Sequence, residues 1–397
     1  MQRIFPLVPS VDKVFMRSAL TIAWLGIVAP LAAQQVPETR LARPDARFPR
    51  ELSSVSGLLE LPDGRVLVSD GIDETLLRID LRTMKADTIS RAGAGPGEYK
   101  GPDLLYGLPA GGVLLVDLGN ARLSFFDAAF KYKESSPIAR GEPATGLTMV
   151  VPDGVDSQGR IYFRSMMRNP NGSRGDSGAV LRWARPAETF DTVGKVKLGE
   201  VKVKSSGGPN NRSMSMQGVP YSPEDVWAVA PDGRIAIVRA ADYHLEWKSP
   251  TGQVVRGPAI AAKGVPVRDA EKREYAADLR NGISMQVTSE NGKMSMRMGR
   301  GGPAARDAAD QIPDLEWPAT KPVFRAVRVA PDGNAWVERY VAAGAPREYD
   351  VFGADAKIKG RVVLPAGRRL VGFGKGVVYL REVTEDELNY LERYRIP

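Results

Sequence analysis

The fold is decided by one stretch of the sequence, GAGPGEYKGPDLLYGLPAGGVLLVDLGNARLSFFD (residues 93–127). Its opening glycines suit a phosphate-binding nest, but the dinucleotide-binding motif needs a helix directly after the glycines. The two prolines and further glycines of residues 96–102 exclude a helix of useful length. We therefore predict that residues 91–99 form a corner between strands, in which Glu98 accepts backbone N–H bonds and Tyr99 packs between two structural units.

The second half of this stretch, a glycine turn followed by two short β-rich runs, recurs along the chain. The six turn segments are LPDGRVLVSD (61–70), LPAGGVLLVD (108–117), DSQGRIYFRS (156–165), APDGRIAIVRA (230–240), APDGNAWVERY (330–340) and GKGVVYLRE (374–382). Gly64, Gly111 and Gly159 are 47 or 48 residues apart. A period in the forties is typical of propeller blades. The sequence therefore predicts an all-β fold, a six-bladed β-propeller of four-stranded antiparallel blades.

The last unit stops at its third strand, because the chain ends at Pro397. We predict that an N-terminal strand, ETRLARPD (38–45), supplies the missing fourth strand. Such closure joins the two ends of the ring and removes exposed sheet edges. The alternative is a loose N-terminal arm.

The stretch from residue 93 to 127 also resembles the repeat of the NHL family. The resemblance rests on Gly97, Glu98, Tyr99, Pro102, Gly111, Asp117, Asn120, Arg122, Phe126 and Asp127. The whole chain resembles exported bacterial six-bladed propellers of this kind, which implies the fold and leaves the function open. Related architectures include amidating lyases with histidine-bound zinc and calcium-dependent lactonases with Glu, Asn and Asp ligands. A single histidine, His244, disfavours the lyase chemistry.

The N-terminus predicts export. From Met16, a possible true start, the sequence MRSALTIAWLGIVAPLAAQQ has a basic start, an apolar run and a small-residue end. We predict a signal peptide at residues 1–33 and a periplasmic or secreted propeller at 34–397, with an uncleaved anchor as the alternative. No later segment is apolar enough to span a membrane. The net charge is +8, and basic and acidic residues are interspersed along the chain. We therefore expect a soluble protein that attracts anions and has no nucleic-acid partner.

Six residues at the ends of the predicted second strands form the candidate binding site. They are Asp70, Asp117, Arg164, Arg239, Arg339 and Arg381. Four guanidiniums around one opening would repel each other, so Glu338, Glu382, nearby Asp or a bound anion must offset them. We therefore expect the face to bind an anionic ligand such as a carboxylate or sugar acid. In the alternative interpretation, these side chains only fasten turns and neighbouring blades.

Three insertions, residues 166–178, 195–225 and 256–325, are predicted to lie on the same face. Within the last of them, residues 267–282 read as a helix whose apolar side, including Tyr275, docks on the propeller. Methionine-rich runs in the insertions suit packing better than copper binding. His244 reads as a partly buried strand residue.

No catalytic or metal-binding residue can be assigned from these patterns. The absence of cysteine excludes disulfides, thiolate zinc sites and cysteine nucleophiles. We expect a monomeric, non-enzymatic binding scaffold without a cofactor, recognising a protein, a peptide or an anionic small molecule or glycan. The alternative is a hydrolase or lactonase that depends on calcium or another divalent cation.

Overall fold

The computed structural model describes residues 1, 36–142, 146–165, 175–187, 189–208, 211–280, 283–290, 293–300, 315–384 and 388–396. The chain divides into two units, Met1–Gln35 and Val36–Pro397. The predicted signal peptide, with Met16, lies outside the described residues. Among the helices that the structure does describe, none is long and apolar enough to cross a membrane.

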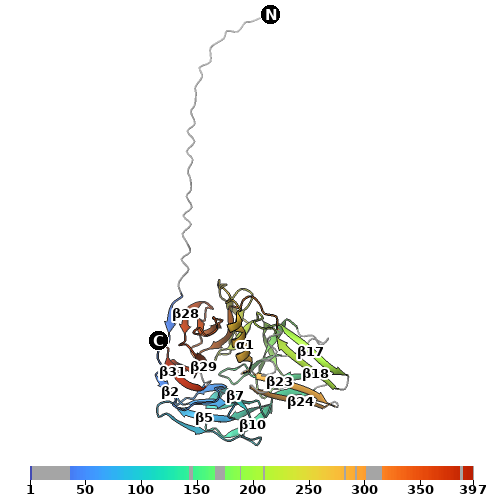
Figure 1. Cartoon of the computed structure of the whole chain (residues 1–397), viewed down its shortest axis with the longest axis vertical. Coiled ribbons are helices and arrows are strands. Elements are labelled where there is room, and N and C mark those ends of the chain that lie inside the picture. Colours follow the sequence, from blue (N-terminus) through green and yellow to red (C-terminus); the bar gives the residue numbers. More distant parts are fainter. Residues whose placement is uncertain are drawn as a thin grey trace. The chain divides into compact units, whose positions relative to one another are not determined.

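The second unit is built from six four-stranded blades (Figure 1). Blade one consists of β3 (Gly57–Glu60), β4 (Val66–Asp70), β5 (Thr75–Asp80) and β6 (Lys85–Thr88). Blade two consists of β7 (Pro102–Gly107), β8 (Val113–Asp117), β9 (Arg122–Phe126) and β10 (Tyr132–Pro137). Blade three consists of β13 (Gly154–Val155), β14 (Ile161–Arg164), β15 (Ser177–Trp183) and β16 (Asp191–Lys197).

The other three blades follow the same order. Blade four consists of β19 (Val226–Val229), β20 (Ile235–Arg239), β21 (His244–Lys248) and β22 (Val254–Arg256). Blade five contains β25 (Phe324–Val329), β26 (Ala335–Arg339), β27 (Glu348–Phe352) and β28 (Ile358–Val363). Blade six contains β29 (Arg368–Gly374), β30 (Val377–Val383) and β31 (Asn389–Arg395). The predicted all-β propeller of six antiparallel blades is therefore confirmed.

The glycine turns join the first and second strands of the blades. The turn glycines have φ angles of 71° to 83°, at Gly64, Gly111, Gly159, Gly233, Gly333 and Gly376. Residues with a Cβ seldom adopt this left-handed conformation. In the Asp-Gly turns the aspartate side chain also accepts the backbone N–H two residues on, as Asp63 does from Arg65 at 3.0 Å. The repeat thus encodes the same turn at six places.

The core lies between the blades, in six separate hydrophobic clusters that each join two neighbours around the ring. Strand β4 shows the reason, because alternate side chains point to opposite faces of a strand. Leu67 packs against blade two, whereas Val66 and Val68 pack against blade six. All five residues of β4 are buried. Strands enclosed on both faces therefore read as continuous apolar runs.

The corner at residues 91–99 fastens blade one to blade two, as predicted. Glu98 accepts the backbone N–H of Gly95 at 2.8 Å. Tyr99 is fully buried between the two blades, and its hydroxyl donates to the carbonyl of Ile89 and accepts from the N–H of Leu76. The loop is a structural corner, and its polar groups are used within the fold.

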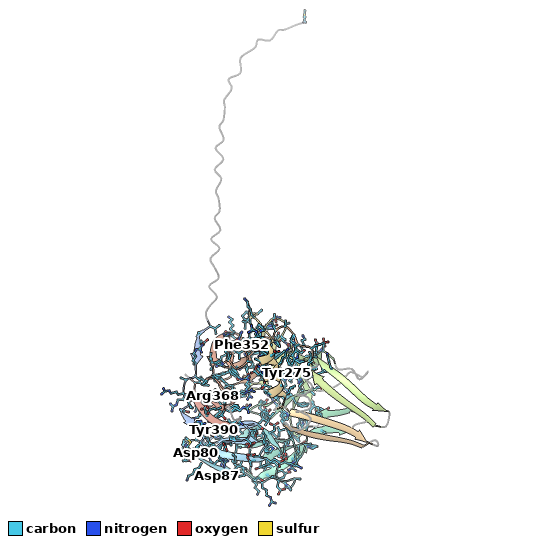
Figure 2. The ribbon with its side chains drawn as sticks, viewed as in Figure 1. Asp80, Asp87, Tyr275, Phe352, Arg368 and Tyr390 are labelled. Atoms are coloured by element: carbon cyan, nitrogen blue, oxygen red, sulfur yellow. The ribbon has the colours of Figure 1, made fainter. Side chains whose placement is uncertain are left out.

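The N-terminal segment closes the ring, but it forms two short strands in two blades, where one strand in the last blade was predicted. Strand β2 (Ala46–Arg47) is the fourth strand of blade six and pairs antiparallel with β31. Its Arg47 guanidinium lies 3.8 Å from the centre of the Tyr390 ring (Figure 2). Strand β1 (Glu38–Arg40) adds a fifth, parallel strand to blade five, beside β28. The segment thus pairs with both of the last two blades.

The remaining elements belong to the connections. They are the short helix η1 (Pro109–Gly111), β11 (Ala139–Glu142), β12 (Gly146–Met149), β17 (Val201–Gly208), β18 (Asn211–Gly218), α1 (Asp269–Arg280), β23 (Ile283–Glu290) and β24 (Lys293–Arg300). Strands β17, β18, β23 and β24 form a further sheet outside the blades. Most of the predicted insertion 166–178 lies outside the described residues, as do the methionine side chains of these strands.

Candidate functional site

The predicted strand-end residues lie at corresponding places in the blades. Five are the last residue of a second strand: Asp70 of β4, Asp117 of β8, Arg164 of β14, Arg239 of β20 and Arg339 of β26. Arg381 lies in β30, two residues before its end, opposite Arg369.

The two aspartates hold turns. Asp70 is 1% exposed and accepts hydrogen bonds from the hydroxyl and the backbone N–H of Ser54 at 2.7 and 2.9 Å. Asp117 is buried and accepts from Asn120 at 2.7 Å and from the Arg122 guanidinium at 3.3 Å. Burial raises the pKa of Asp117, although these hydrogen bonds oppose the rise. These contacts match the fastening role that the sequence left as the alternative.

The arginines of blades three and four are paired with carboxylates. Arg239 lies 2.9 Å from Asp225 and 2.7 Å from Glu246. Arg164 lies 3.8 Å from Glu224. Because Glu224 and Asp225 are adjacent in the chain, one loop ahead of β19 neutralises both cations.

Protein groups also contact the other two arginines. Arg339 donates to Asp350 at 3.1 Å and lies 3.8 Å from Glu348. Arg381 donates to the side-chain oxygen of Asn389 at 3.2 Å. Carboxylates of the protein therefore compensate Arg164, Arg239 and Arg339.

Glu338 and Glu382, which were expected to offset the candidate arginines, pair with other residues. Glu338 binds Arg347 at 2.5 Å, and Glu382 binds Arg47 at 2.9 Å. Each glutamate is a sequence neighbour of a candidate arginine, and neighbouring side chains on a strand point to opposite faces. The expected offset comes instead from nearby aspartates, Asp225 at Arg239 and Asp350 at Arg339.

A cavity of about 430 Å³ lies beside Arg339; we call it the blade-five pocket. Its charged lining residues are Arg40, Lys263, Arg339 and Glu348. The Arg40 side chain is 70% exposed, and Lys263 is exposed and has no ion pair within the described ranges. Arg40 pairs with Glu38 at 2.6 Å and Arg339 with Asp350 at 3.1 Å, so Lys263 is the basic lining group without an ion pair among the described residues. Sequence reasoning found only Arg339, because residues 40, 263 and 339 meet only in the closed ring.

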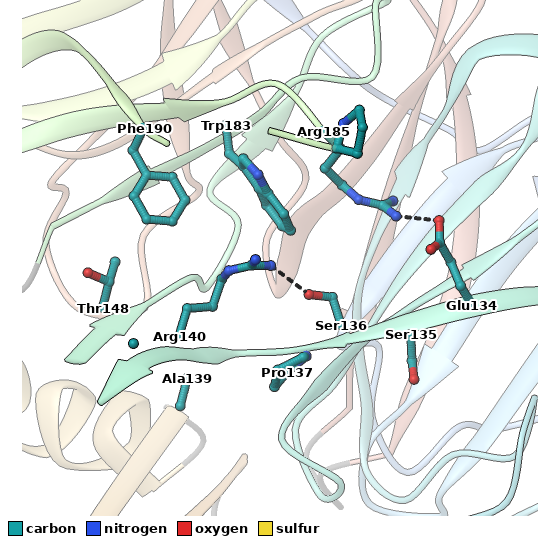
Figure 3. A pocket seen from close by; sticks show the side chains of 12 residues that line it. Glu134, Ser135, Ser136, Pro137, Ala139, Arg140, Thr148, Trp183, Arg185 and Phe190 are labelled. Atoms are coloured by element: carbon teal, nitrogen blue, oxygen red, sulfur yellow. Dashed lines mark hydrogen bonds and ion pairs between the residues drawn. The ribbon is translucent and has the colours of Figure 1, made fainter. Parts of the chain in front are cut away.

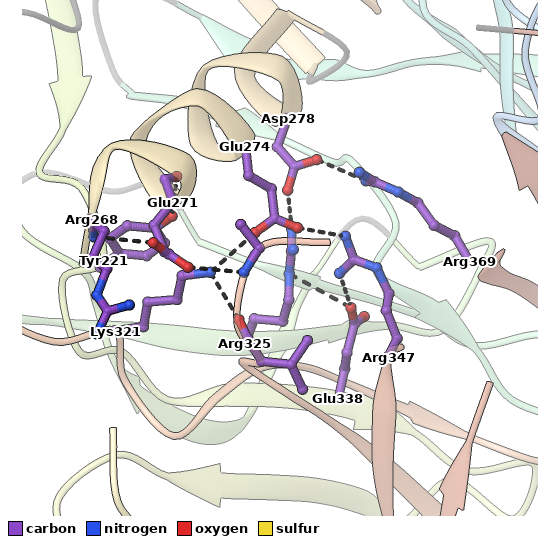
Figure 4. A network of polar contacts seen from close by, with 12 residues as sticks. Tyr221, Arg268, Glu271, Glu274, Asp278, Lys321, Arg325, Glu338, Arg347 and Arg369 are labelled. Atoms are coloured by element: carbon purple, nitrogen blue, oxygen red, sulfur yellow. Dashed lines mark hydrogen bonds and ion pairs between the residues drawn. The ribbon is translucent and has the colours of Figure 1, made fainter. Parts of the chain in front are cut away.

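Helix α1 covers the starts of the inner strands of blades five and six (Figure 4). Its Asp278 pairs with Arg325 of β25 at 2.9 Å and with Arg369 of β29 at 2.7 Å. Its Glu274 pairs at 3.0 Å with Lys321, which is 1% exposed.

An aromatic cluster supports the same docking. The ring of Tyr275 lies 5.2 Å from Tyr221 and 5.4 Å from Trp317, measured between ring centres (Figure 2). The predicted helix is therefore present, and Tyr275 packs on aromatic residues of the connections between blades. The acidic side of the helix, which the sequence analysis did not consider, docks as well.

The docking of α1 is expected to weaken in acid. Burial alone would raise the pKa of Asp278, but Arg325 and Arg369 outweigh it and lower the pKa below its ordinary value of 3.8. A lowered folded-state pKa contributes stability above the unfolded-state value, and this contribution is lost as the pH falls through the folded-state pKa. The stability difference between the native protein and Asp278→Asn should therefore shrink from about pH 6 to about pH 3. Urea unfolding of both proteins at the two pH values measures it; an unchanged difference would contradict this assignment.

A second polar group lies at the inner strands of blades two and three. The Tyr106 hydroxyl donates to the carbonyl of Pro152 at 2.7 Å. Burial raises the pKa of Tyr106, the charges of Asp153 and Asp103 raise it further, and Arg328 opposes them. Asp153 is reached by solvent, yet enough protein surrounds it to raise its pKa. Its side chain accepts the backbone N–H of Arg164 at 3.1 Å.

His244 is 3% exposed and lies between two carboxylates of its own chain segment. Its Nδ1 is 2.5 Å from Asp242, and its Nε2 is 3.2 Å from Glu246. Burial would raise the pKa of Glu246, but hydrogen bonds from His244 and Arg239 outweigh it and lower the pKa. His244 and Glu246 share one face of β21, whereas Asp242 lies in the turn before the strand, where Tyr243 has a φ of 38°.

The described residues do not by themselves form a metal site. Across these ranges, no three carboxylate or histidine side chains gather closely enough to hold a metal ion. Asp103 and Asp153 are two carboxylates, whereas calcium takes six to eight oxygen ligands.

Comparison with known proteins gives the fold alone. No protein-family model and no curated protein sequence matches the chain. A member of the DUF4221 family from Bacteroides vulgatus is 10% identical, with a TM-score of 0.48, over 90% of this chain and 95% of that one. A gluconolactonase from Xanthomonas campestris is 11% identical, with a TM-score of 0.40, over 90% and 94%.

A PQQ-bound aldose sugar dehydrogenase from Streptomyces coelicolor is 14% identical, with a TM-score of 0.39, over 89% of this chain and 97% of that one. Streptogramin-type lyases have similar folds as well. At this identity the likeness extends to no residue role.

Proposed function

We propose that the protein is an exported binding scaffold that holds a small anionic ligand, a dicarboxylate, in the blade-five pocket. The single observation that carries the proposal is Lys263 in the pocket lining, an exposed cation with no ion pair within the described ranges, beside Arg40 and Arg339. Basic groups that line a concave site attract an anion. The basic N-terminal sequence with its apolar run supports export.

The three cations have different degrees of freedom. Arg339 is 16% exposed and is held by Asp350, so its guanidinium is fixed before a ligand arrives. Arg40 and Lys263 extend from two separate segments and can close on the ligand from the sides. A fixed guanidinium beside two side chains that can move favours recognition of the charge of a ligand over recognition of one ligand shape.

Replacing Lys263 with Gln is expected to weaken the binding of succinate about three- to fivefold, since one surface charge contact contributes about 1 kcal/mol. Isothermal titration calorimetry measures the change. Arg256→Gln is the matched control, because Arg256 is 61% exposed and lies outside the pocket. An equal loss in both variants would show that net charge alone attracts the ligand, and it would refute the pocket.

The second candidate function is hydrolysis, in the form of a divalent-cation-dependent hydrolase or lactonase. The observation that favours it is the solvent-reached Asp153, whose charge, like that of Asp103, raises the pKa of the Tyr106 hydroxyl. Native mass spectrometry of the secreted protein, with and without chelator, distinguishes the candidates. A retained cation supports the hydrolase, and a retained organic anion supports the scaffold.

A further inference from the structure

A second cavity, of about 720 Å³, lies between the outer strands of blades two and three; we call it the inter-blade pocket (Figure 3). Strands β10 and β11 contribute Glu134, Ser136 and Arg140 to it, and the end of β15 with the following loop contributes Trp183 and Arg185. Its volume suits a small organic ligand. None of its lining residues belongs to the blade-five pocket.

Two guanidiniums of this pocket lie against one indole ring. The Arg140 guanidinium carbon is 4.3 Å from the centre of the Trp183 ring, and that of Arg185 is 5.7 Å from it. Arg185 also lies over Phe125, at 3.6 Å. The indole itself is fixed, because its N–H donates to the carbonyl of Ala187 at 2.5 Å. A guanidinium stacked on a ring directs its N–H donors along its own plane, where they suit a carboxylate.

Glu134 shows where a carboxylate can bind the Arg185 guanidinium. It forms an ion pair with Arg185, and its side chain is 59% exposed on the outermost strand of blade two. Exposed ion pairs of this kind contribute little to stability, so a ligand can displace Glu134 from Arg185. Glu134 is thus a competitor within the chain for the same guanidinium.

The rest of the lining indicates what else the ligand carries. Three hydroxyl side chains, Ser135, Ser136 and Thr148, lie beside the apolar Pro137 and Phe190. The hydroxyl groups of a ligand ring can form hydrogen bonds to the serine and threonine side chains, while the C–H face of the ring contacts the proline and the phenylalanine. We propose that the inter-blade pocket binds a hydroxylated ring carboxylate of the uronate class, with its carboxylate on Arg185 and Arg140.

The test is calorimetric titration of the whole protein with glucuronate, and with glucose as the uncharged probe. Arg185→Gln should weaken glucuronate binding about tenfold, and Arg185→Lys should fall between it and the native protein, because lysine keeps the charge without the planar fork. Glu134→Gln should strengthen binding about threefold, because it removes the internal competitor. Glucose should give no measurable binding.

Asp191→Asn is the matched control for Glu134→Gln. Asp191 begins β16, is 62% exposed and pairs with Arg182 of β15; neither residue lines the pocket. It should leave glucuronate binding unchanged. Equal tightening by both variants would show a general charge effect and overturn the proposal, as would a Glu134→Gln variant that binds no better than the native protein. Glu134 is exposed, so its variant remains decisive even where Arg185→Gln does not fold.

Discussion

Replacement of Asp350 with Ala is expected to lower the free energy of unfolding by about 3–5 kcal/mol, because it removes a buried carboxylate that pairs with two partly buried guanidiniums and accepts a buried hydroxyl. Asp350 is fully buried in β27. It accepts hydrogen bonds from Tyr243 of blade four at 2.6 Å, from Arg339 at 3.1 Å and from Arg361 at 2.8 Å. One carboxylate therefore joins two blades and two guanidiniums.

Urea unfolding followed by circular dichroism measures this change, and graded variants separate its causes. Asp350→Asn keeps the shape but removes the charge, so it should give a smaller loss. Tyr243→Phe removes one hydrogen bond and should lower the stability by about 1–2 kcal/mol. Asp191→Ala breaks an exposed pair and should change it by less than about 1 kcal/mol. If Asp350→Ala resembled Asp191→Ala, the carboxylate would not hold the two blades together.

The propeller could be predicted from sequence because its signals are local. A glycine with positive φ, an aspartate that bonds its own turn and an apolar run of four or five residues each act within one hairpin. Gly64 and Gly333 have nearly the same φ although their blades differ in sequence. When such a unit is repeated, each blade must pack its two apolar faces against neighbouring blades. A closed ring gives every blade two such neighbours.

The closing strand was harder to place because its pairing is long-range. Strand β2 has two residues, too few for any periodic pattern, and its partner β31 is at the other end of the chain. The parallel strand β1 pairs in a different blade and has no local signal at all. The resemblance to the NHL repeat bears on the hairpins and carries no information on this pairing.

The candidate site was predictable only in part, for a related reason. Arg339 was found because it lies at a fixed offset from a turn glycine. Its carboxylate partner Asp350 is in the next strand, and Lys263 is in a connection between blades, so neither follows from the repeat. The pair of His244 and Glu246 could have been predicted from strand alternation, but the contact with Asp242 depends on the turn before β21.

A chain that begins at Glu51 instead of Val36 is expected to lose cooperative unfolding. It would lack both N-terminal strands, so blade six would keep three strands and present an open edge along β31. It would also lack Phe48, which is 3% exposed and packs between blades six and one. Because the cores lie between blades, opening one interface exposes apolar surface on both sides of it. A broad thermal transition and dye binding to exposed apolar surface are the expected readouts.

A point variant separates the loss of packing from the loss of strand pairing. Phe48→Ala keeps β2 but removes a large buried ring, and it should lower the free energy of unfolding by about 3–5 kcal/mol with cooperativity retained. Arg40→Ala, in the exposed end of β1, should change it by less than about 1 kcal/mol. If the chain from Glu51 unfolded as cooperatively as the longer chain, blade six would be stable with three strands. The N-terminal segment would then be an attachment to the ring and would have no part in closing it.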